Sequence, residues 1–159
     1  MVVSLIIANF KVTKILINQG NSTDILYLKT FQKLEISLNL IQPHFEPFMG
    51  FARERVETMG YVDLMTTFGQ GSFSRSFTIS YSIVNADTIY LTLISRKTLK
   101  ELGAIISTPQ LKMKFPTMIG EIVTIKANQR QARLCYVESL KVTTYPPDRR
   151  SKSYGPTLG

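Results

Sequence analysis

The side chains best suited to chemistry in this sequence are gathered in one short polar stretch, residues 18–24. The stretch reads Asn-Gln-Gly-Asn-Ser-Thr-Asp and directly follows the apolar residues 15–17. An apolar strand that ends in a tight polar loop can present backbone groups and a short side chain to a cleft. Taken alone, the same pattern is an ordinary turn between two elements, and turns greatly outnumber active sites.

Two elements must hold this loop in place. Residues 2–7 and 12–17 are short apolar runs around a polar connection, which predicts a hairpin whose second strand ends in the loop. After the loop, apolar residues recur at a helical spacing, so we expect a short helix over residues 24–34. Thr23 or Asp24 could cap the start of this helix.

The middle of the chain is typical of antiparallel strands. Residues 48–62 have two extended arms around a charged centre, which indicates a long hairpin that Gly50 and Gly60 would allow to bend. Residues 73–84 alternate apolar and hydroxyl side chains, as a half-buried strand does. The sequence therefore predicts a protein dominated by β-structure.

A second short helix is expected over residues 95–103. Ser95 can cap its start, and Gly103 can end it. The remaining apolar runs predict further strands at residues 61–68, 89–94, 104–108 and 111–116.

The composition favours an intracellular globular protein. The chain has 159 residues, of which 44% are hydrophobic, enough for one domain with a buried core. A single cysteine excludes an internal disulfide framework, and with one histidine it argues against a zinc site, so we expect neither metal nor cofactor. No apolar run approaches the roughly 20 residues of a membrane span, and residues 2–8 do not resemble a signal peptide. We therefore expect the protein to be cytoplasmic and not to associate with a membrane.

The net charge of +8 is unevenly distributed along the chain. Residues 1–125 contain 12 basic and 9 acidic side chains, whereas residues 126–159 contain 7 basic and 2 acidic ones, together with three prolines. A basic, proline-containing end is usually a solvated linker, and nucleic-acid binding would call for interleaved aromatic residues and a fold motif. We therefore disfavour nucleic acid as a partner.

Five fragments, in order, resemble the protease domain of gypsy-type long-terminal-repeat retroelements, which is a retropepsin-like aspartic protease of plant-type polyproteins. The family's strand followed by Asp-Thr-Gly-Ser-Ser-x-Asp-Ile-Leu resembles residues 15–26, and its flap resembles residues 49–60. Its apolar-Ile-Gly-Arg-x-x-Leu element is similar to residues 93–99, and the strand that follows is similar to residues 106–117. Residues 132–141 are similar to the linker toward the reverse transcriptase. Each fragment is weak alone, and their common order carries the resemblance.

The resemblance implies an all-β fold with one or two short helices. This would be a retropepsin-like closed β-barrel, one lobe of an acid-protease fold, over residues 1–125, with residues 126–159 as a basic tail toward a reverse transcriptase. Family members supply one aspartate per subunit, so a two-fold homodimer builds the catalytic pair. An extended peptide or polyprotein segment would then lie in the cleft between the subunits.

The resemblance places Asn18 at the position of the catalytic aspartate. Such proteases need two facing carboxylates that share a proton, one to activate water and one to polarise the scissile carbonyl. A carboxamide has nearly the same shape but does not take a proton from water. Gln19 replaces the family's threonine, while Gly20 is retained. We therefore expect an inactive homologue of an aspartic endopeptidase, although whether the chain is an enzyme stays open.

The resemblance also implies a set of substrate-cleft residues from three parts of the chain. Asp24 has two alternative roles, as a helix cap or as a cleft carboxylate paired with Arg96. Arg96 can equally be structural, and Ser95 stands where the family has glycine. The complete set of cleft positions is Asp24, Gly50, Phe51, Ala52, Ile94, Ser95 and Arg96.

Two other functions stay open at this point. The domain would be an active protease if Asn18 deamidated slowly to aspartate, or if a heterodimer with an intact relative supplied one carboxylate. It would instead be a basic nucleic-acid-binding module if the excess charge of residues 126–159 directed its function.

Overall fold

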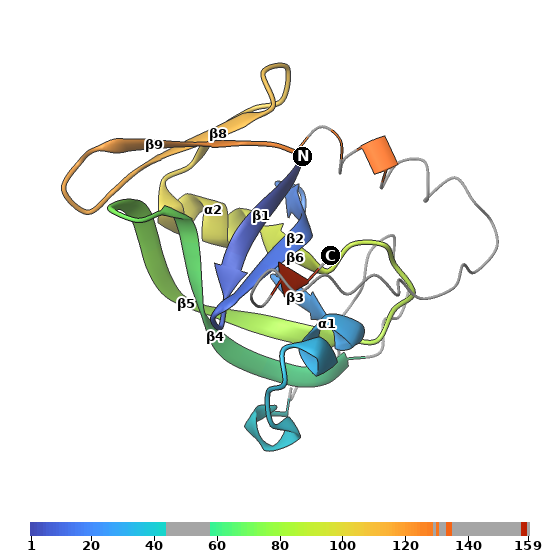
Figure 1. The fold of residues 1–159 in the computed structure, drawn as a ribbon. Helices are drawn as coiled ribbons and strands as arrows, with labels where there is room; N and C mark the ends of the chain where they lie inside the picture. Colours follow the sequence, from blue (N-terminus) through green and yellow to red (C-terminus); the bar gives the residue numbers. More distant parts are fainter. Residues whose placement is uncertain (44–57, 129, 131–132, 135–156, 159) are drawn as a thin grey trace.

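The computed structural model describes residues 1–43, 58–128, 130, 133–134 and 157–158. These residues form a closed six-stranded barrel, a separate three-stranded sheet and two short α-helices (Figure 1). The barrel strands follow the order β1-β4-β5-β3-β6-β2 and close by pairing of β1 with β2. The elements are β1 Val2–Ile7, β2 Phe10–Asn18, β3 Ile25–Tyr27, α1 Leu28–Lys33, the 3-10 turn η1 Leu38–Leu40, β4 Thr58–Gln70, β5 Phe73–Val84, β6 Thr92–Ser95, α2 Arg96–Leu102, β7 Ile105–Ser107, β8 Lys112–Pro116, β9 Ile122–Lys126 and β10 Thr157–Leu158.

The predicted first hairpin is present as β1 and β2. Its two-residue turn has positive φ angles at Ala8 (48°) and Asn9 (72°), the geometry whose twist matches that of paired antiparallel strands. The register of β1 and β2 shifts between Val3 and Leu5, and beyond this bulge Ile6 and Ile7 pair with β2 on one edge and with β4 on the other. The hairpin thus supplies both the closure of the barrel and the strand that carries Asn18.

A long hairpin of β4 and β5 makes most of one barrel wall. Gly69 has φ +95° at its turn, and a Cβ there would lie 2.2 Å from the carbonyl oxygen of Phe73, so a larger residue does not fit. Along β5 the exposed fraction falls from 56% at Phe73 to zero at Tyr81 and Ile83. The predicted alternation holds from Ser76 to Tyr81, whereas Phe73 is exposed and residues 82–84 are all buried, so β5 enters the core only in its second half.

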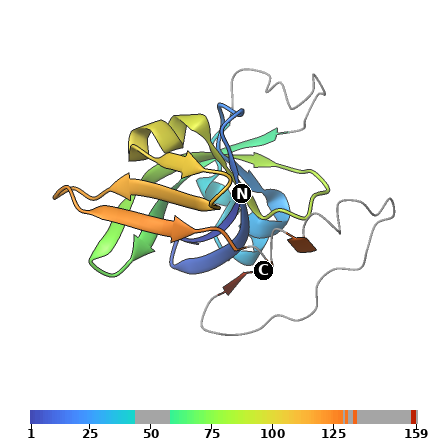
Figure 2. The same ribbon diagram turned by 90° about the horizontal axis from the view of Figure 1, so that it is seen from above.

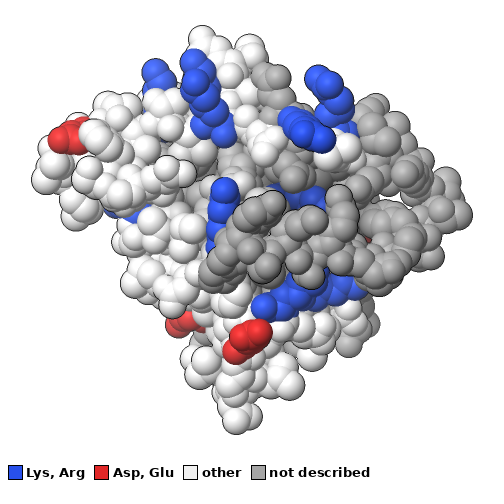
Figure 3. Space-filling model, viewed as in Figure 1, with Lys and Arg blue, Asp and Glu red and all other residues white. Residues whose placement is uncertain are grey.

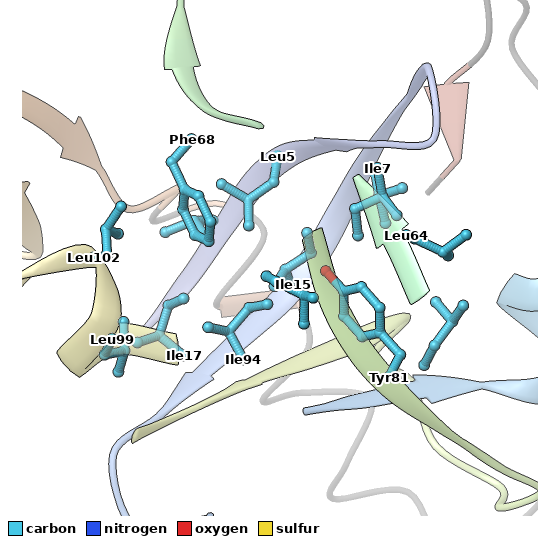
Figure 4. Close-up of a cluster of buried hydrophobic side chains, with 14 of the residues drawn as sticks. Leu5, Ile7, Ile15, Ile17, Leu64, Phe68, Tyr81, Ile94, Leu99 and Leu102 are labelled. Carbon is cyan, nitrogen blue, oxygen red and sulfur yellow. The ribbon is translucent and has the colours of Figure 1, made fainter. Parts of the chain in front are cut away.

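The core fills the barrel and continues to α2 (Figure 4). Side chains from β1, β2, β4, β5 and β6 converge there, with Leu99 and Leu102 of α2 at one side. The ring of Phe68 stacks on Phe77 at 5.6 Å between centroids and meets Phe115 of β8 edge-on at 6.2 Å. These contacts attach the three-stranded sheet to the barrel.

The helix expected over residues 24–34 begins later than predicted. Ile25–Tyr27 is strand β3, fully buried and paired in parallel with β5 and antiparallel with β6, and α1 starts at Leu28. Tyr27 occupies the N-cap position without a side-chain hydrogen bond, so neither Thr23 nor Asp24 caps this helix. Three consecutive apolar residues suit a strand that is covered on both faces, and periodicity alone cannot separate the two cases.

The second predicted helix agrees closely with α2. Ser95 is its N-cap, with a hydroxyl that accepts from the Thr98 amide at 3.5 Å, and Gly103 follows it at φ 72°. The strand expected at residues 89–94 is shorter than predicted, because β6 begins at Thr92. None of the helices in the described ranges is long and apolar enough to cross a membrane.

The three-stranded sheet of β7, β8 and β9 stands beside the barrel when viewed from above (Figure 2). Two of its strands were expected, at residues 104–108 and 111–116, but β9 is not among the strands that the sequence predicts. Ala127 and Asn128 then donate backbone hydrogen bonds to Leu111 and Val2. The predicted hairpin at residues 48–62 cannot be followed, because residues 44–57 lie outside the described part of the chain.

Candidate active site

The structure places Asn18 at the point where two parallel strands end together. β2 and β6 pair in register from Ile15 opposite Thr92 to Asn18 opposite Ser95. Asn18 is the last residue of β2, and Ser95 is both the last residue of β6 and the N-cap of α2. The loop after β2 and the start of α2 are therefore neighbours, although 77 positions separate Asn18 from Ser95 in the sequence.

Local hydrogen bonds shape the loop itself. The Asn18 side-chain oxygen accepts from the Gly20 amide at 2.9 Å, which is an Asx-type turn. The Asn21 side-chain amide donates to the Thr23 carbonyl at 2.6 Å. Asn18 is half-buried, whereas Gln19 and Gly20 are exposed. The tip of the loop thus presents Gln19 and Gly20 to solvent, and Asn18 folds the tip back on itself.

Asp24, at the end of the loop, connects it to the start of α2 by hydrogen bonds. It is only 5% exposed, and its two carboxylate oxygens accept from the Ser95 amide and from the Thr98 hydroxyl, each at 2.7 Å. A buried carboxylate is stable when hydrogen bonds of this kind satisfy both oxygens. The Arg96 amide donates in turn to the Asn21 carbonyl at 2.8 Å. Asp24, Ser95 and Thr98, here called the support triad, fix the loop to the beginning of α2.

The structure gives Asp24 a different partner from either alternative that the sequence suggested. It does not cap α1, and both of its oxygens bind the first turn of α2, while the Arg96 side chain lies exposed. Thr98, the partner that sequence reasoning missed, is 74 residues away from Asp24. No local pattern could signal such a contact.

The other predicted cleft positions have mixed outcomes. Ile94 and Ser95 are fully buried, Ile94 in the hydrophobic core and Ser95 as the N-cap of α2. Gly50, Phe51 and Ala52 lie outside the described residues. A substrate contact at any of the predicted cleft positions stays a prediction.

A polar cavity of about 410 Å³ adjoins the loop. Hydroxyl groups dominate its lining, with one lysine and the edge of Asp24, so it suits hydrogen-bonding groups of a ligand better than a large apolar side chain. The lining residues are Ser22, Thr23, Asp24, Tyr61, Ser80, Ser82 and Lys97. Within the described ranges, no three His, Cys, Asp or Glu side chains come together in a way that could hold a metal ion.

Sequence comparisons find no matching family model and no matching curated protein. Solved structures do match. The retroviral protease-like domain of Ddi1 from Leishmania major superposes with a TM-score of 0.58 at 13% identity, over 79% of this chain and 91% of that domain. A retropepsin-like aspartic protease from Rickettsia conorii gives a TM-score of 0.49 at 14% identity, over 78% and 80% of the two chains. EIAV protease in complex with the inhibitor HBY-793 gives 0.47 at 16% identity, over 67% and 91%.

At such low identity the match to the Leishmania domain shows the fold alone. It agrees with the closed barrel and the two short helices of this chain, and it confirms the predicted fold class. The described part of the chain therefore has the retropepsin-like fold of aspartic protease domains.

Proposed function

We propose that this chain is the protease-like domain of a retroelement polyprotein, and that it binds an extended peptide without cleaving it. The observation that supports this most strongly is the place of Asn18, at the end of β2 and in register with Ser95 at the start of α2. The resemblance assigns the catalytic aspartate to this position, and here it is a carboxamide. The polyprotein origin rests on the order of the five resembling fragments.

The missing carboxylate is the reason to expect no catalysis. Loss of one positioned general base costs roughly 10²–10⁴ in rate, and a homodimer would lose both. Asp24 cannot substitute for it, because the support triad already uses both of its oxygens. Between residues 15 and 28 the sequence contains no other acid.

Dimerisation is part of this proposal. One barrel contains one such loop, so a cleft with two facing loops needs a second copy. Large apolar side chains are exposed on the three-stranded sheet and its β8–β9 turn: Ile105 at 75%, Met118 at 84% and Ile119 at 79%. Exposed apolar groups of this size favour a protein interface. The polar cavity beside the loop would then receive part of the bound peptide.

The test is to restore the acid. We expect the double variant Asn18→Asp with Gln19→Thr to cleave peptides at acidic pH, with inhibition by pepstatin, because the support triad already holds the loop against the start of α2. Asn21→Asp is the matched control, since it adds a carboxylate three residues further along the same loop and should give no activity.

Sedimentation velocity should accompany the assay, because a chain that stays monomeric cannot face two loops. A double variant that dimerises but does not cleave would contradict the assignment of position 18. Peptide binding by the unaltered dimer should be seen in parallel, and its absence would contradict the binding function.

A further inference from the structure

A hollow lies near the start of β2, at the other end of this strand from Asn18. It has a volume of about 830 Å³, and residues of β1, β9 and the β4–β5 turn line it together with Lys11 near the start of β2. Asn18 lies seven positions after Lys11 along extended chain, a distance of roughly 20 Å. We call this hollow the β1–β9 groove, and it is separate from the candidate active site.

Two incompletely paired strand edges border the β1–β9 groove. In the described sheets β9 pairs only with β8, and all five of its residues line the groove. β1 pairs with β4 only at Ile6 and Ile7, so Ser4 and Leu5 border the groove without a neighbouring strand on that edge among the described residues. The Asn128 amide donates to the Val2 carbonyl at 2.9 Å and closes one end. From there β1 and β9 diverge toward the β4–β5 turn (Figure 1).

The lining of the β1–β9 groove is positively charged, and its wide end is apolar. Lys11 and Lys126 line it, both exposed, and its lining contains no acidic residue. Basic side chains are also the more frequent ones on the molecular face that carries β1 and β9 (Figure 3). At the wide end, Phe73 and Ile122 are 56% and 61% exposed. The lining thus offers backbone hydrogen bonds, positive charge and one apolar contact.

We propose that the β1–β9 groove binds an extended, acidic segment of a partner protein by strand addition. The open edges of β9 and β1 would supply backbone hydrogen bonds, as in other cases of β-augmentation. Lys11 and Lys126 would attract acidic side chains, and Phe73 and Ile122 would receive an apolar one.

Charge favours an acidic partner segment in the β1–β9 groove over the chain's own residues 126–159 and over a second copy of the chain. The chain's own residues 126–159 contain 7 basic and 2 acidic side chains, so they do not complement the lysines. Thr157–Leu158 of this segment (β10) pairs with β2 at Lys11 and Val12, and neither Thr157 nor Leu158 is among the described residues that line the groove. A second copy carries a net charge of +8 and is also poorly matched.

The proposal can be tested with the full chain and a fluorescent peptide of about ten residues that alternates glutamate and valine. We expect saturable binding that weakens with salt, and slower amide hydrogen exchange over Ile122–Lys126 on addition of the peptide. The charge-reversed double variant Lys11→Glu with Lys126→Glu should weaken binding about tenfold or more. Lys29→Glu, at an exposed lysine of α1 outside the groove, is the matched control and should bind normally.

Two further comparisons separate strand addition from simple charge attraction. A peptide with the same sequence but N-methylated at alternate residues keeps its charge and loses backbone donors, so it should bind much more weakly. No binding at about 1 mM peptide, equal weakening by Lys29→Glu, or equal binding of the N-methylated peptide would each overturn the proposal. Dissociation of a dimer by the charge-reversed variant would identify a second copy as the occupant and overturn it as well. None of these outcomes depends on cleavage or on Asn18.

Discussion

The support triad and the loop tip lie next to each other and differ in nearly every physical respect. Asp24, Ser95 and Thr98 are buried, and their contacts join segments that are more than 70 residues apart in sequence. Gln19 and Gly20 are exposed, and the bonds that shape the tip connect residues only two or three positions apart. The triad is therefore part of what holds the barrel together, whereas the tip is not.

If Asn18 occupies the catalytic position, as we propose, this difference would explain how the fold is kept without an acid there. Removal of a buried hydrogen-bonded carboxylate destabilises the folded chain, because the donors around it lose their partner. A change from carboxylate to carboxamide at the half-buried Asn18 leaves the fold intact, since its oxygen still accepts from the Gly20 amide. We therefore expect substitutions in the support triad to cost more stability than substitutions at position 18.

The largest expected effect comes from breaking the support triad. Asp24→Ala should lower the free energy of unfolding by about 3–5 kcal/mol, because the Ser95 amide and the Thr98 hydroxyl both lose a charged acceptor in a buried place. Urea denaturation followed by circular dichroism measures this. Asp63→Ala is the control: Asp63 is an exposed acid bonded to Ser80, and its loss should cost about 1 kcal/mol or less. Equal effects at the two positions would contradict the special role of Asp24.

The second-largest expected effect on stability is the difference between substitutions at Gly60 and at Gly20. Gly60 in the wall has φ +120°, and a Cβ there would lie 2.1 Å from the Gln42 carbonyl oxygen, so Gly60→Ala should cost about 3 kcal/mol. At Gly20 the nearest atom to a Cβ is the Asn18 side-chain oxygen at 3.4 Å, so Gly20→Ala should change stability by about 0.5 kcal/mol or less. Thermal unfolding of both variants checks this. A large loss at Gly20 would show that the tip also supports the fold.

The smallest effect concerns Tyr81 in the barrel wall. Its hydroxyl pairs with Thr66 at 2.8 Å, so Tyr81→Phe should cost about 1 kcal/mol at neutral pH. Burial raises the pKa of Tyr81 far above its ordinary value of 10.0, with a smaller contribution from the Asp24 charge, while the Thr66 bond acts against the rise.

The sign of the resulting pH dependence follows from this shift. The folded state keeps the Tyr81 proton above pH 10, where the unfolded state releases it, so stability is complete below pH 10 and falls as the pH rises further. Urea titrations at about pH 8 and pH 11 should show this fall and a smaller one in Tyr81→Phe. Burial also raises the pKa of Tyr27, which accounts for part of the remaining dependence. An identical fall in both proteins would contradict the assignment to Tyr81.

Local sequence patterns predicted the elements whose signals are themselves local. The β1–β2 hairpin, the alternation of β5, and α2 between Ser95 and Gly103 all follow from neighbouring residues. Strand β3 was mistaken for helix, because Ile25–Tyr27 is recognisable as a strand only beside β5 and β6. Within the candidate site, the loop could be located from sequence, while the bond between Asp24 and Thr98 could not.

The proposed lack of catalysis is tested most directly by a cleavage assay on the unaltered chain. Peptide substrates are incubated with the protein at acidic pH, with and without pepstatin, and intact mass is recorded at the start and end to confirm that residue 18 is still asparagine. We expect no pepstatin-sensitive cleavage while that side chain remains a carboxamide. Pepstatin-sensitive cleavage by protein whose mass shows asparagine at position 18 would contradict it.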